Sequence, residues 1–287
     1  MAASPAALIL GTGVVGRATA VALAREGFSV SGYDPDASAV KDFPGEVISD
    51  DAAPRDWAVI AICVPTPTVD GAMSADALVD ALNLAKRCLD PAAAFTVIAI
   101  RSTIVPGTME SVVLPPVREL VASSRVGICH WPSFARERVA LEDEAHPRAI
   151  VFGTDGGARV HEIMRRCVAS ARCGVSFVSF PEAELIKQGA KLFNALKISY
   201  FNAIGDWATE RSGNGQTVAD VISIVAEGCW NPAYGTAVGP PFGGACLPKD
   251  LDAFAQRLVT DGSPHRELLQ AIQEINEAHG RQGSAFE

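Results

Sequence analysis

Cys246 is the residue of this sequence best placed to act as a nucleophile. It lies in Phe242-Gly-Gly-Ala-Cys-Leu-Pro-Lys-Asp250, a glycine-rich loop that directly precedes a predicted helix. A helix N-terminus and a nearby lysine both stabilise a thiolate, which is the reactive form of cysteine. We interpret the remaining six cysteines as core or incidental residues: Cys63, Cys88, Cys129, Cys167, Cys173 and Cys229. The loop therefore predicts covalent chemistry at Cys246.

A second candidate site is the run Gly11-Thr-Gly13-Val14-Val15-Gly16, which follows the apolar segment AALIL and opens an alanine-rich stretch. In a dinucleotide-binding loop the first glycine permits a tight turn, the second lets pyrophosphate approach the backbone, and the third lets the helix pack on the strand. The anion then lies at a helix N-terminus. Glycines in such loops are often only turn residues, so the motif alone leaves that alternative open.

Asp34 strengthens the prediction of a cofactor site. It ends the second apolar run (FSVSGYD), 23 residues after Gly11. A carboxylate there accepts hydrogen bonds from both hydroxyls of the adenosine ribose and repels a 2′-phosphate. We therefore expect NAD rather than NADP, with the alternative that Asp34 only opens a turn before Pro35.

The elements that must position these residues fall into two predicted domains. In residues 1–180, short apolar runs suited to buried parallel strands alternate with helical stretches, the pattern of a doubly wound α/β domain of the Rossmann type. The runs are AALIL, FSVSGYD, WAVIAICV, FTVIAI, VGICH and RAIVFG.

Residues 181–287 predict an all-α domain. A helical apolar period continues for roughly thirty residues from Pro181, which is long for a globular helix. The Gly/Pro-dense segment NPAYGTAVGPPFGGACLPKD interrupts the pattern, and two further helices follow, DLDAFAQRLVTDG and PHRELLQAIQEINEAHG. The nucleophile loop therefore belongs to the helical domain.

Composition narrows the class of protein. The 287 residues carry a formal net charge of −9, which disfavours nucleic acid and anionic membrane as partners. Mean hydropathy is +0.20, yet no apolar stretch approaches the roughly 20 residues of a membrane span. The N-terminus resembles no signal peptide, and the seven cysteines show no CxxC or Cys/His spacing for a metal. We expect a cytoplasmic enzyme with reduced thiols and no metal.

Together these motifs make the chain resemble the UDP-glucose/GDP-mannose dehydrogenase family along essentially its whole length. Any one motif would be weak evidence, whereas their shared order is specific. The motifs are GTGVVG, CVPTP (63–67), RSTIVPGT (101–108), PSFARE (132–137), EAELIKQGAKLFNALKISYFN (182–202) and FGGACLPKD (242–250).

The resemblance implies a chemistry. A primary alcohol, typically C6 of a nucleotide-linked hexose, is oxidised to an aldehyde by NAD; the cysteine traps the aldehyde as a thiohemiacetal; a second oxidation leaves a thioester, and water releases a carboxylate. These steps need a base, an oxyanion stabiliser and a soft nucleophile. The residues that match the family's catalytic positions are Cys246 as nucleophile, Lys187 for developing negative charge, Asp250 and Thr103 for a water, and Glu137 as a further acid.

The same resemblance assigns binding residues. Without the resemblance, simpler interpretations apply to several of these residues. Lys187 and Lys191 would form a solvated helix face, Glu137 would be a surface acid, and CVPTP would be a strand-ending turn. Beyond the glycine loop and Asp34, the cofactor residues are Val64, Pro65, Thr66, Ser102 and Thr103. The substrate residues are Ser133, Phe134, Lys191, Trp230, Phe242, Gly243 and Gly244.

Three positions depart from the family pattern. Ser133 replaces a glutamate and cannot act as a base at neutral pH, which puts thioester hydrolysis in doubt. Lys191 replaces an asparagine, so two ammonium groups lie at i and i+4, a pair that depresses a lysine pKa or binds an anion. Trp230 replaces an arginine that in family dimers reaches the neighbour's sugar, and so substitutes a stacking surface for a charge.

Family members also continue for roughly another hundred residues, into a second nucleotide-gripping domain that this sequence does not include. The substrate is therefore expected to be a nucleotide sugar or a smaller sugar or nucleoside, bound by a homodimer that forms through the helix beginning near Glu182. Two alternatives stay open. One is a two-electron dehydrogenase of the alcohol or β-hydroxyacid type that stops at the aldehyde or ketone, and the other is a catalytically inactive, dimeric NAD-binding protein.

Overall fold

The computed structural model describes residues 4–70, 72–93, 95–232, 234, 241–243 and 247–283. Contacts between Cα atoms divide the chain into two units, residues 1–191 and 192–287, which are described one at a time. The boundary falls inside the long helix α6 (Phe180–Ser212).

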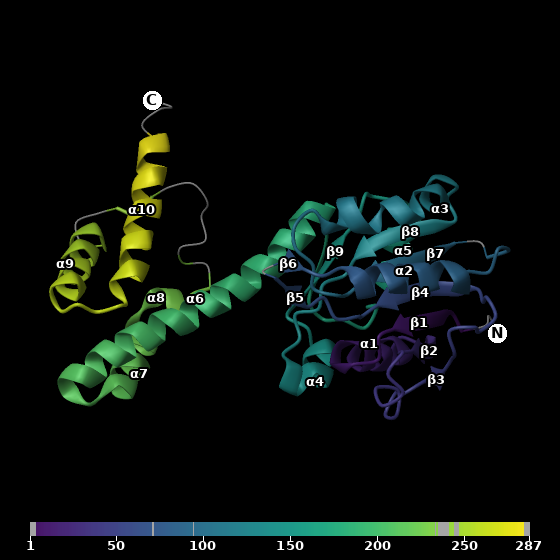
Figure 1. The fold of residues 1–287 in the computed structure, drawn as a ribbon, viewed down its shortest axis with the longest axis horizontal. Coiled ribbons are helices and arrows are strands. Elements are labelled where there is room, and N and C mark those ends of the chain that lie inside the picture. The colour runs from purple at the N-terminus through teal and green to yellow at the C-terminus, as the bar shows by residue number, and fades with distance from the viewer. Residues whose placement is uncertain are drawn as a thin grey trace. The chain divides into compact units, whose positions relative to one another are not determined.

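The first unit is built on an eight-stranded sheet with the order β10-β9-β8-β7-β4-β1-β2-β3 (Figure 1). All six apolar runs of the sequence form strands of this sheet, since buried apolar residues suit strands covered on both faces. The strands are β1 (Ala6–Leu10), β2 (Ser29–Tyr33), β3 (Glu46–Val47), β4 (Trp57–Ile62), β7 (Thr96–Ile100), β8 (Val126–His130), β9 (Ala149–Gly153) and β10 (Gly174–Val178).

Six neighbouring strands pair in parallel, in the order β3-β2-β1-β4-β7-β8. The chain places β2 and β3 on one side of β1 and then β4, β7 and β8 on the other, so the switch point of the sheet lies between β1 and β4. Ligands of such sheets bind at the carboxyl ends of the strands flanking this switch point. The glycine loop follows β1 and the CVPTP segment follows β4, so both lie at that edge.

The parallel pattern is broken once. Strand β9 pairs with β8 in the antiparallel direction, through the single residue pair His130 and Gly153, whereas β10 is parallel to β9. The segment between β8 and β9 contains only a short 3-10 helix, η3 (Glu137–Val139), and the six-residue helix α4 (Ala140–Ala145). The sheet is therefore mostly, and not wholly, parallel.

Helices cover both faces of the sheet. Helix α2 (Asp76–Cys88) and the π-helix η1 (Met109–Val113) pack on one face around Leu8, Ile60 and Ile98. Helices α1 (Val14–Arg25) and α5 (Ala158–Arg166) pack on the other. The smaller elements are the hairpin β5 (Thr68–Val69) and β6 (Ala72–Met73), the 3-10 helix η2 (Pro115–Val117) and helix α3 (Arg118–Ala122).

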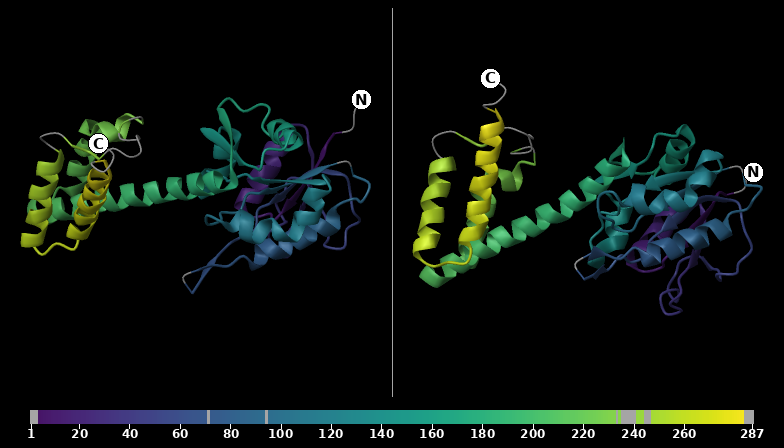
Figure 2. Two further views of the ribbon diagram at one scale, coloured as in Figure 1. Left: turned by 90° about the horizontal axis from the view of Figure 1, so that it is seen from above. Right: turned by 45° about the horizontal axis from the view of Figure 1, so that its top comes forward.

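The second unit is helical in all its described elements. After the end of α6 come α7 (Gly215–Val225), α8 (Glu227–Trp230), α9 (Leu247–Thr260) and α10 (Arg266–Gly283). Figure 2 shows α9 and α10 side by side, and Ala255, Leu258 and Leu269 form the buried core between them. The predicted fold class, a Rossmann-type sheet followed by helices with one long helix, is confirmed.

Candidate functional site

Close packing requires glycine at two positions of the loop after β1, whereas the third glycine faces open space. Gly11 has a positive φ of +91°, and a Cβ there would lie 2.7 Å from the carbonyl oxygen of Cys63. A Cβ on Gly16 would overlap the carbonyl oxygen of Gly11. By contrast, no atom lies within 4 Å of a Cβ placed on Gly13. The open side of the loop is therefore at Gly13, where a ligand can approach the backbone.

Helix α1 begins directly after this opening. Its first turn, which contains Val14 and Val15, carries no acidic residue, and no side chain caps its N-terminal amides. Unpaired amides and the helix dipole make such a terminus attractive to an anion. The loop thus fits the pyrophosphate of a dinucleotide.

Asp34 lies just beyond β2 and links the two strand ends. Its Oδ2 accepts a hydrogen bond of 2.7 Å from the backbone N–H of Thr12, and its Oδ1 accepts one of 3.0 Å from Asp36. Oδ2 also accepts a longer hydrogen bond of 3.4 Å from the Thr12 hydroxyl, whereas Oδ1 keeps a further lone pair to which a ribose hydroxyl can bind. Thr12 is fully buried and was not among the predicted residues, because the glycine motif leaves its position unspecified.

The loops after β4 and β7 are joined by side-chain hydrogen bonds. Ser102 Oγ donates to the carbonyl oxygen of Val64 at 2.7 Å, and Thr66 Oγ1 donates to that of Thr103 at 2.6 Å. Pro65 is exposed between them. Five predicted cofactor residues therefore lie together at the same sheet edge as the glycine loop.

Lys187, on the first part of α6, is buried and lies over the loop that follows β8. Its Nζ donates a hydrogen bond to the carbonyl oxygen of Ser133 and lies 5.3 Å from the centre of the Phe134 ring. Burial lowers the pKa of Lys187 to about 8, with further contributions from the positive charges of Lys191 and Arg101. This shift is of the kind found at functional lysines.

Three neighbours of Lys187 on the same helix hold the loop after β7. Lys191 Nζ lies 3.5 Å from Thr103 Oγ1, and Gln188 donates to the carbonyl oxygen of Ile104 at 2.9 Å. The buried carboxylate of Glu184 accepts from the backbone amides of Gly107 at 2.7 Å and Met109 at 2.8 Å. Residues three and four apart share a helix face, which is why one helix can hold both loops.

Ser133 takes part in a buried ion-pair network that the sequence did not predict. Its Oγ donates to Glu144 Oε1 at 2.6 Å, and the same oxygen pairs with Arg101 Nη2 at 2.5 Å. The Arg101 guanidinium lies 4.1 Å from the ring centre of Trp131. The carboxylate of Glu144 therefore lies next to Ser133. It belongs to α4, eleven residues further along the chain.

His130, at the end of β8, is fully buried beside this network. Among the described residues, neither ring nitrogen of His130 has a hydrogen-bond partner. The same holds for Nε and Nη1 of Arg101. Burial lowers the pKa of His130 to about 4, assisted by the charge of Lys187. The imidazole is therefore neutral at pH 7.

Other predicted residues lie away from these contacts or outside the described part of the chain. Glu137 is exposed at the start of η3 and makes no hydrogen bond or ion pair with a described residue. Gly244 and Cys246 lie outside the described residues, as do the side chains of Asp250 in α9 and Trp230 in α8.

The described start of the nucleophile loop is fixed to α10. Asn276 Oδ1 accepts from the backbone N–H of Phe242 at 2.7 Å, and its Nδ2 donates to the Phe242 carbonyl oxygen at 3.1 Å. A Cβ added at Gly243, the next residue, would meet no described atom within 4 Å. The sequence gives no signal that singles out Asn276 among the polar residues of the helical segment EINEAHG.

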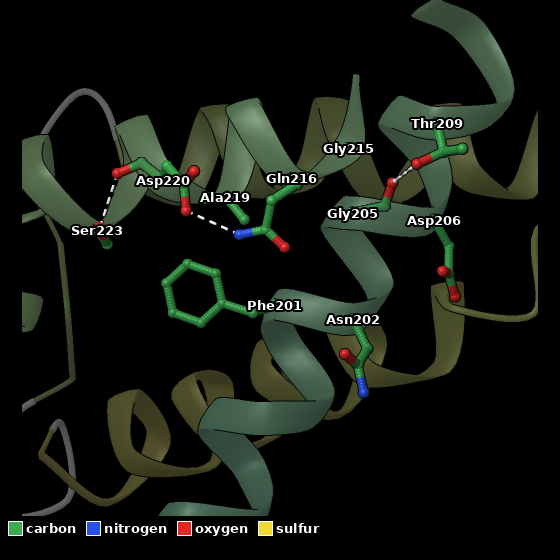
Figure 3. Close-up of a pocket in the computed structure, with 10 residues that line it drawn as sticks. All are labelled: Phe201, Asn202, Gly205, Asp206, Thr209, Gly215, Gln216, Ala219, Asp220 and Ser223. Atoms are coloured by element: carbon green, nitrogen blue, oxygen red, sulfur yellow. Dashed lines mark hydrogen bonds between the residues drawn. The ribbon is translucent and has the colours of Figure 1, made fainter. Parts of the chain in front are cut away.

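The second unit has a polar hollow of its own, of about 430 Å³, between α6 and α7 (Figure 3). The two helices approach closely at Gly215, where a Cβ would overlap the Gly205 carbonyl oxygen. Gln216 donates to Asp220 at 2.7 Å across the wall of the hollow. None of the predicted site residues lines it.

Neither a metal centre nor a membrane span is found in the described part of the chain. No group of three His, Cys, Asp or Glu side chains there could hold an ion, and no helix is long and apolar enough to cross a bilayer.

Two family models match most of the chain. Residues 46–168 match the NAD binding domain of the UDP-glucose/GDP-mannose dehydrogenase family, and residues 181–278 match the central domain of the same family. The glycine loop and Asp34 precede the first matched stretch.

Individual relatives agree with the models. UDP-glucose 6-dehydrogenase of Rhizobium meliloti is 31% identical over 227 residues, which are 78% of this chain and 51% of that protein. GDP-mannose 6-dehydrogenase of Azotobacter vinelandii is 29% identical over 68% of this chain and 45% of its own length. The chain thus spans about half the length of the curated relatives it matches.

Solved structures extend the likeness to the fold. A UDP-glucose dehydrogenase from Pyrobaculum islandicum superposes with a TM-score of 0.71 at 26% identity, over 96% of this chain and 68% of that one. A GDP-mannose dehydrogenase from Pseudomonas aeruginosa has a TM-score of 0.83 at 23% identity, over 95% and 68%. An imine reductase from Aspergillus terreus has a TM-score of 0.68 at 12% identity and is covered over 95% of its length, which shows a shared fold alone.

Proposed function

Because the chain belongs to the UDP-glucose/GDP-mannose dehydrogenase family, we propose that it oxidises the primary alcohol of a nucleotide sugar, or of a related sugar or nucleoside, with NAD. The observation that carries this proposal is that the open glycine loop, Asp34 and the buried ammonium of Lys187 all lie at the edge of the sheet formed by the carboxyl ends of its parallel strands. A dinucleotide loop beside an oxyanion donor is what alcohol oxidation requires.

NAD is the proposed cofactor, and it supplies an acceptor for hydride. Gly13 and the amides at the start of α1 would hold its pyrophosphate, and Asp34 would hold its adenosine ribose. Val64, Pro65, Thr66, Ser102 and Thr103 would form the nicotinamide side of the pocket, because their loops lie next to the glycine loop at the switch point of the sheet.

In the proposed reaction the alcohol RCH2OH first loses a hydride and a proton to become the aldehyde RCHO. The thiolate of Cys246 adds to the aldehyde carbon, and the resulting thiohemiacetal loses a second hydride and a proton to become a thioester. Water then cleaves the carbon–sulfur bond, releasing RCOO⁻ and restoring the thiol. Two NAD are reduced for each carboxylate formed.

Lys187 is the proposed stabiliser of negative charge on the reacting oxygen. One of its three N–H bonds is donated to the Ser133 carbonyl, which leaves two for a substrate oxygen. With a pKa of about 8, the side chain is mostly protonated at pH 7 and can also give up a proton at modest cost. Thr103 and Asp250 are the proposed partners of the hydrolytic water, and Glu137 a further acid.

Ser133 favours a second candidate, a dehydrogenase that stops after two electrons. Its hydroxyl already donates to Glu144, so it has no proton to give and no basic group with which to activate water. For this two-electron dehydrogenase the product is an aldehyde or ketone, and the reaction does not need Cys246.

We further propose that the protein forms a homodimer through α6. Several large apolar side chains are exposed on the second unit, and Phe193 is 60% exposed on this helix. Contiguous exposed apolar residues on a helix indicate an interface. The residues concerned are Leu192, Phe193, Leu196 and Ile198 on α6, with Val221, Ile224 and Val225 on α7.

The test is the yield of NADH for each molecule of substrate consumed. Purified protein is offered UDP-, GDP- and ADP-hexoses and free nucleosides, beside Cys246→Ala and a matched control, Cys173→Ala, which removes a thiol from the first unit. Two NADH per substrate, lost in Cys246→Ala and retained in the control, is the expected result. One NADH that survives in Cys246→Ala supports the two-electron candidate, and no NADH with any substrate overturns both.

A further inference from the structure

Lys187 and Lys191 form a pair of ammonium groups one helical turn apart, and they reach two different loops of the sheet edge. Lys187 Nζ binds the carbonyl oxygen of Ser133 after β8, and Lys191 Nζ lies 3.5 Å from Thr103 Oγ1 after β7. Both contacts are to neutral oxygens. Among the described residues, neither ammonium forms an ion pair with a carboxylate.

The charges around the pair do not balance. The nearby carboxylate of Glu144 is engaged by Arg101 at 2.5 Å, and His130 is neutral at pH 7. Glu184, on the same helix, has both oxygens on backbone amides of the β7 loop. The described part of the site thus carries an excess of positive charge, because Glu144 and Glu184 are two carboxylates against the three cations Arg101, Lys187 and Lys191. Of the two ammonium groups, that of Lys187 is on a buried side chain. Buried or half-buried charge of one sign is costly unless a counter-charge arrives.

From this arrangement we propose that Lys187, Lys191 and the Thr103 hydroxyl bind an anionic group of the substrate, a carboxylate or a phosphate close to the carbon that is oxidised. The inference rests on the proposed oxidation of an alcohol and names its substrate class. Two ammonium groups and a hydroxyl, reaching from two sides, provide charge-assisted donors for the two or three oxygens of such a group.

The protonation of Lys187 agrees with an anion as the missing partner. Burial, Lys191 and Arg101 all lower its pKa, whereas Glu144 raises it. The remaining groups that face it, Ser133 and the ring of Phe134, carry no charge. A bound anion adds an attractive charge, so it raises the pKa of Lys187 back toward the ordinary value of 10.5.

A binding experiment tests the site without turnover. Competitive labelling with acetic anhydride across a pH series gives the pKa of Lys187, measured with malonate, with inorganic phosphate and with neutral malonamide. The variants are Lys191→Asn and the matched control Lys197→Asn, which removes an exposed lysine from the same helix. We expect malonate or phosphate to reduce the labelling of Lys187 at pH 8 by roughly threefold or more in the wild type and control, and malonamide to have no effect.

The outcomes separate the possibilities. If Lys191→Asn abolishes the anion effect while Lys197→Asn keeps it, the paired site is supported, and the anion with the larger effect identifies carboxylate or phosphate as the group. An anion effect that is equal in all three proteins contradicts a role of Lys191, and the absence of any effect in the folded wild type overturns the proposal.

A turnover arm keeps this inference distinct from the proposed oxidation. Reduction of NAD is compared for two pairs, glycerate against glycerol and glycerol 3-phosphate against glycerol. At least a tenfold preference for one anionic member, lost in Lys191→Asn, is expected. Oxidation of alcohols with no preference for the anion refutes the substrate class and leaves the proposed function standing. Anion binding at Lys187 without any NAD reduction refutes the oxidation and leaves the site standing.

Discussion

The two units of the chain differ in how far their apolar side chains are buried. In the first unit nearly all large apolar side chains on β1, β4 and β7 are buried, and each face of the sheet has a continuous core. In the second unit the buried cluster consists of Ala255, Leu258 and Leu269, while Ile224 is 73% exposed. The first unit completes its own core, whereas the second leaves apolar surface for contact with something else.

The units differ equally in their polar groups. In the first unit the buried side chains of Glu184 and Lys187 bind backbone groups, and buried Arg101 is paired with Glu144. In the second unit the ion pairs are on the surface, as in Arg257 with Asp261. Exposed pairs contribute little to stability, whereas breaking a buried network is costly. Substitutions should therefore affect folding strongly in the first unit and weakly in the second.

The largest effect is expected for Gly16→Ala in the glycine loop. Alanine is normally favoured over glycine inside a helix by about 1 kcal/mol. Here its Cβ would overlap the backbone carbonyl of Gly11, which cannot move without disturbing β1. We expect the free energy of unfolding to fall by about 4 kcal/mol, measured by urea denaturation.

Gly13→Ala is the matched control for that substitution. Its Cβ meets no atom within 4 Å and its φ of −63° suits alanine, so stability should fall by no more than about 1 kcal/mol, the cost of alanine at a helix N-cap. NAD binding, followed by NADH fluorescence, should weaken by at least about tenfold because the methyl group occupies the side on which pyrophosphate approaches. A stable Gly16→Ala protein, or a Gly13→Ala protein that binds NADH normally, would contradict this account of the loop.

Glu184→Ala should have the next largest effect. It leaves the amides of Gly107 and Met109 without their acceptor at a buried site. An unsatisfied buried donor costs roughly 1–3 kcal/mol, so the free energy of unfolding should fall by about 3 kcal/mol for the two together. The matched control is Glu182→Ala at the exposed start of the helix, where a change below about 1 kcal/mol is expected in the same urea titration.

Much of the first unit could be predicted because its signals are local. Apolar runs, glycine spacing and the position of Asp34 depend on neighbours in the sequence, and each lies where the pattern indicated. The antiparallel pairing of β9 could not be predicted from its apolar run, since a buried strand has the same composition in either direction.

The polar network was beyond sequence reasoning for a different reason. Glu144 and Ser133 meet across eleven residues, and Asn276 meets Phe242 across 34. Such pairs depend on how elements pack, and a lone glutamate or asparagine on a helix usually faces solvent. The sequence alone therefore indicates that Ser133 marks the loss of the family's glutamate, although the structure places the Glu144 carboxylate of α4 beside it.

A smaller effect on stability is expected from the protonation of His130. Its pKa in the folded protein is about 4, below the ordinary 6.5, so between these values the unfolded chain binds more protons. Stability is therefore full above about pH 6.5 and declines as the pH falls toward 4. The loss between pH 7.5 and pH 5 should be about 2 kcal/mol in urea titrations. The exposed residue His146 provides the control, because His146→Gln should keep the acid slope that His130→Gln removes.

The smallest effect on folding, and the sharpest test of the contrast between the units, is expected for Ile224→Ser on α7. Its side chain is largely exposed, so the free energy of unfolding of the monomer should change by less than about 0.5 kcal/mol. If this face contacts a second copy of the chain, the substitution removes buried apolar area from the interface and should weaken dimerisation by at least about tenfold, measured by sedimentation equilibrium. Val14→Ser, a half-exposed apolar residue of the first unit, should leave the dimer intact. A wild-type protein that is monomeric at high concentration would show that the exposed apolar residues of the second unit serve a different contact.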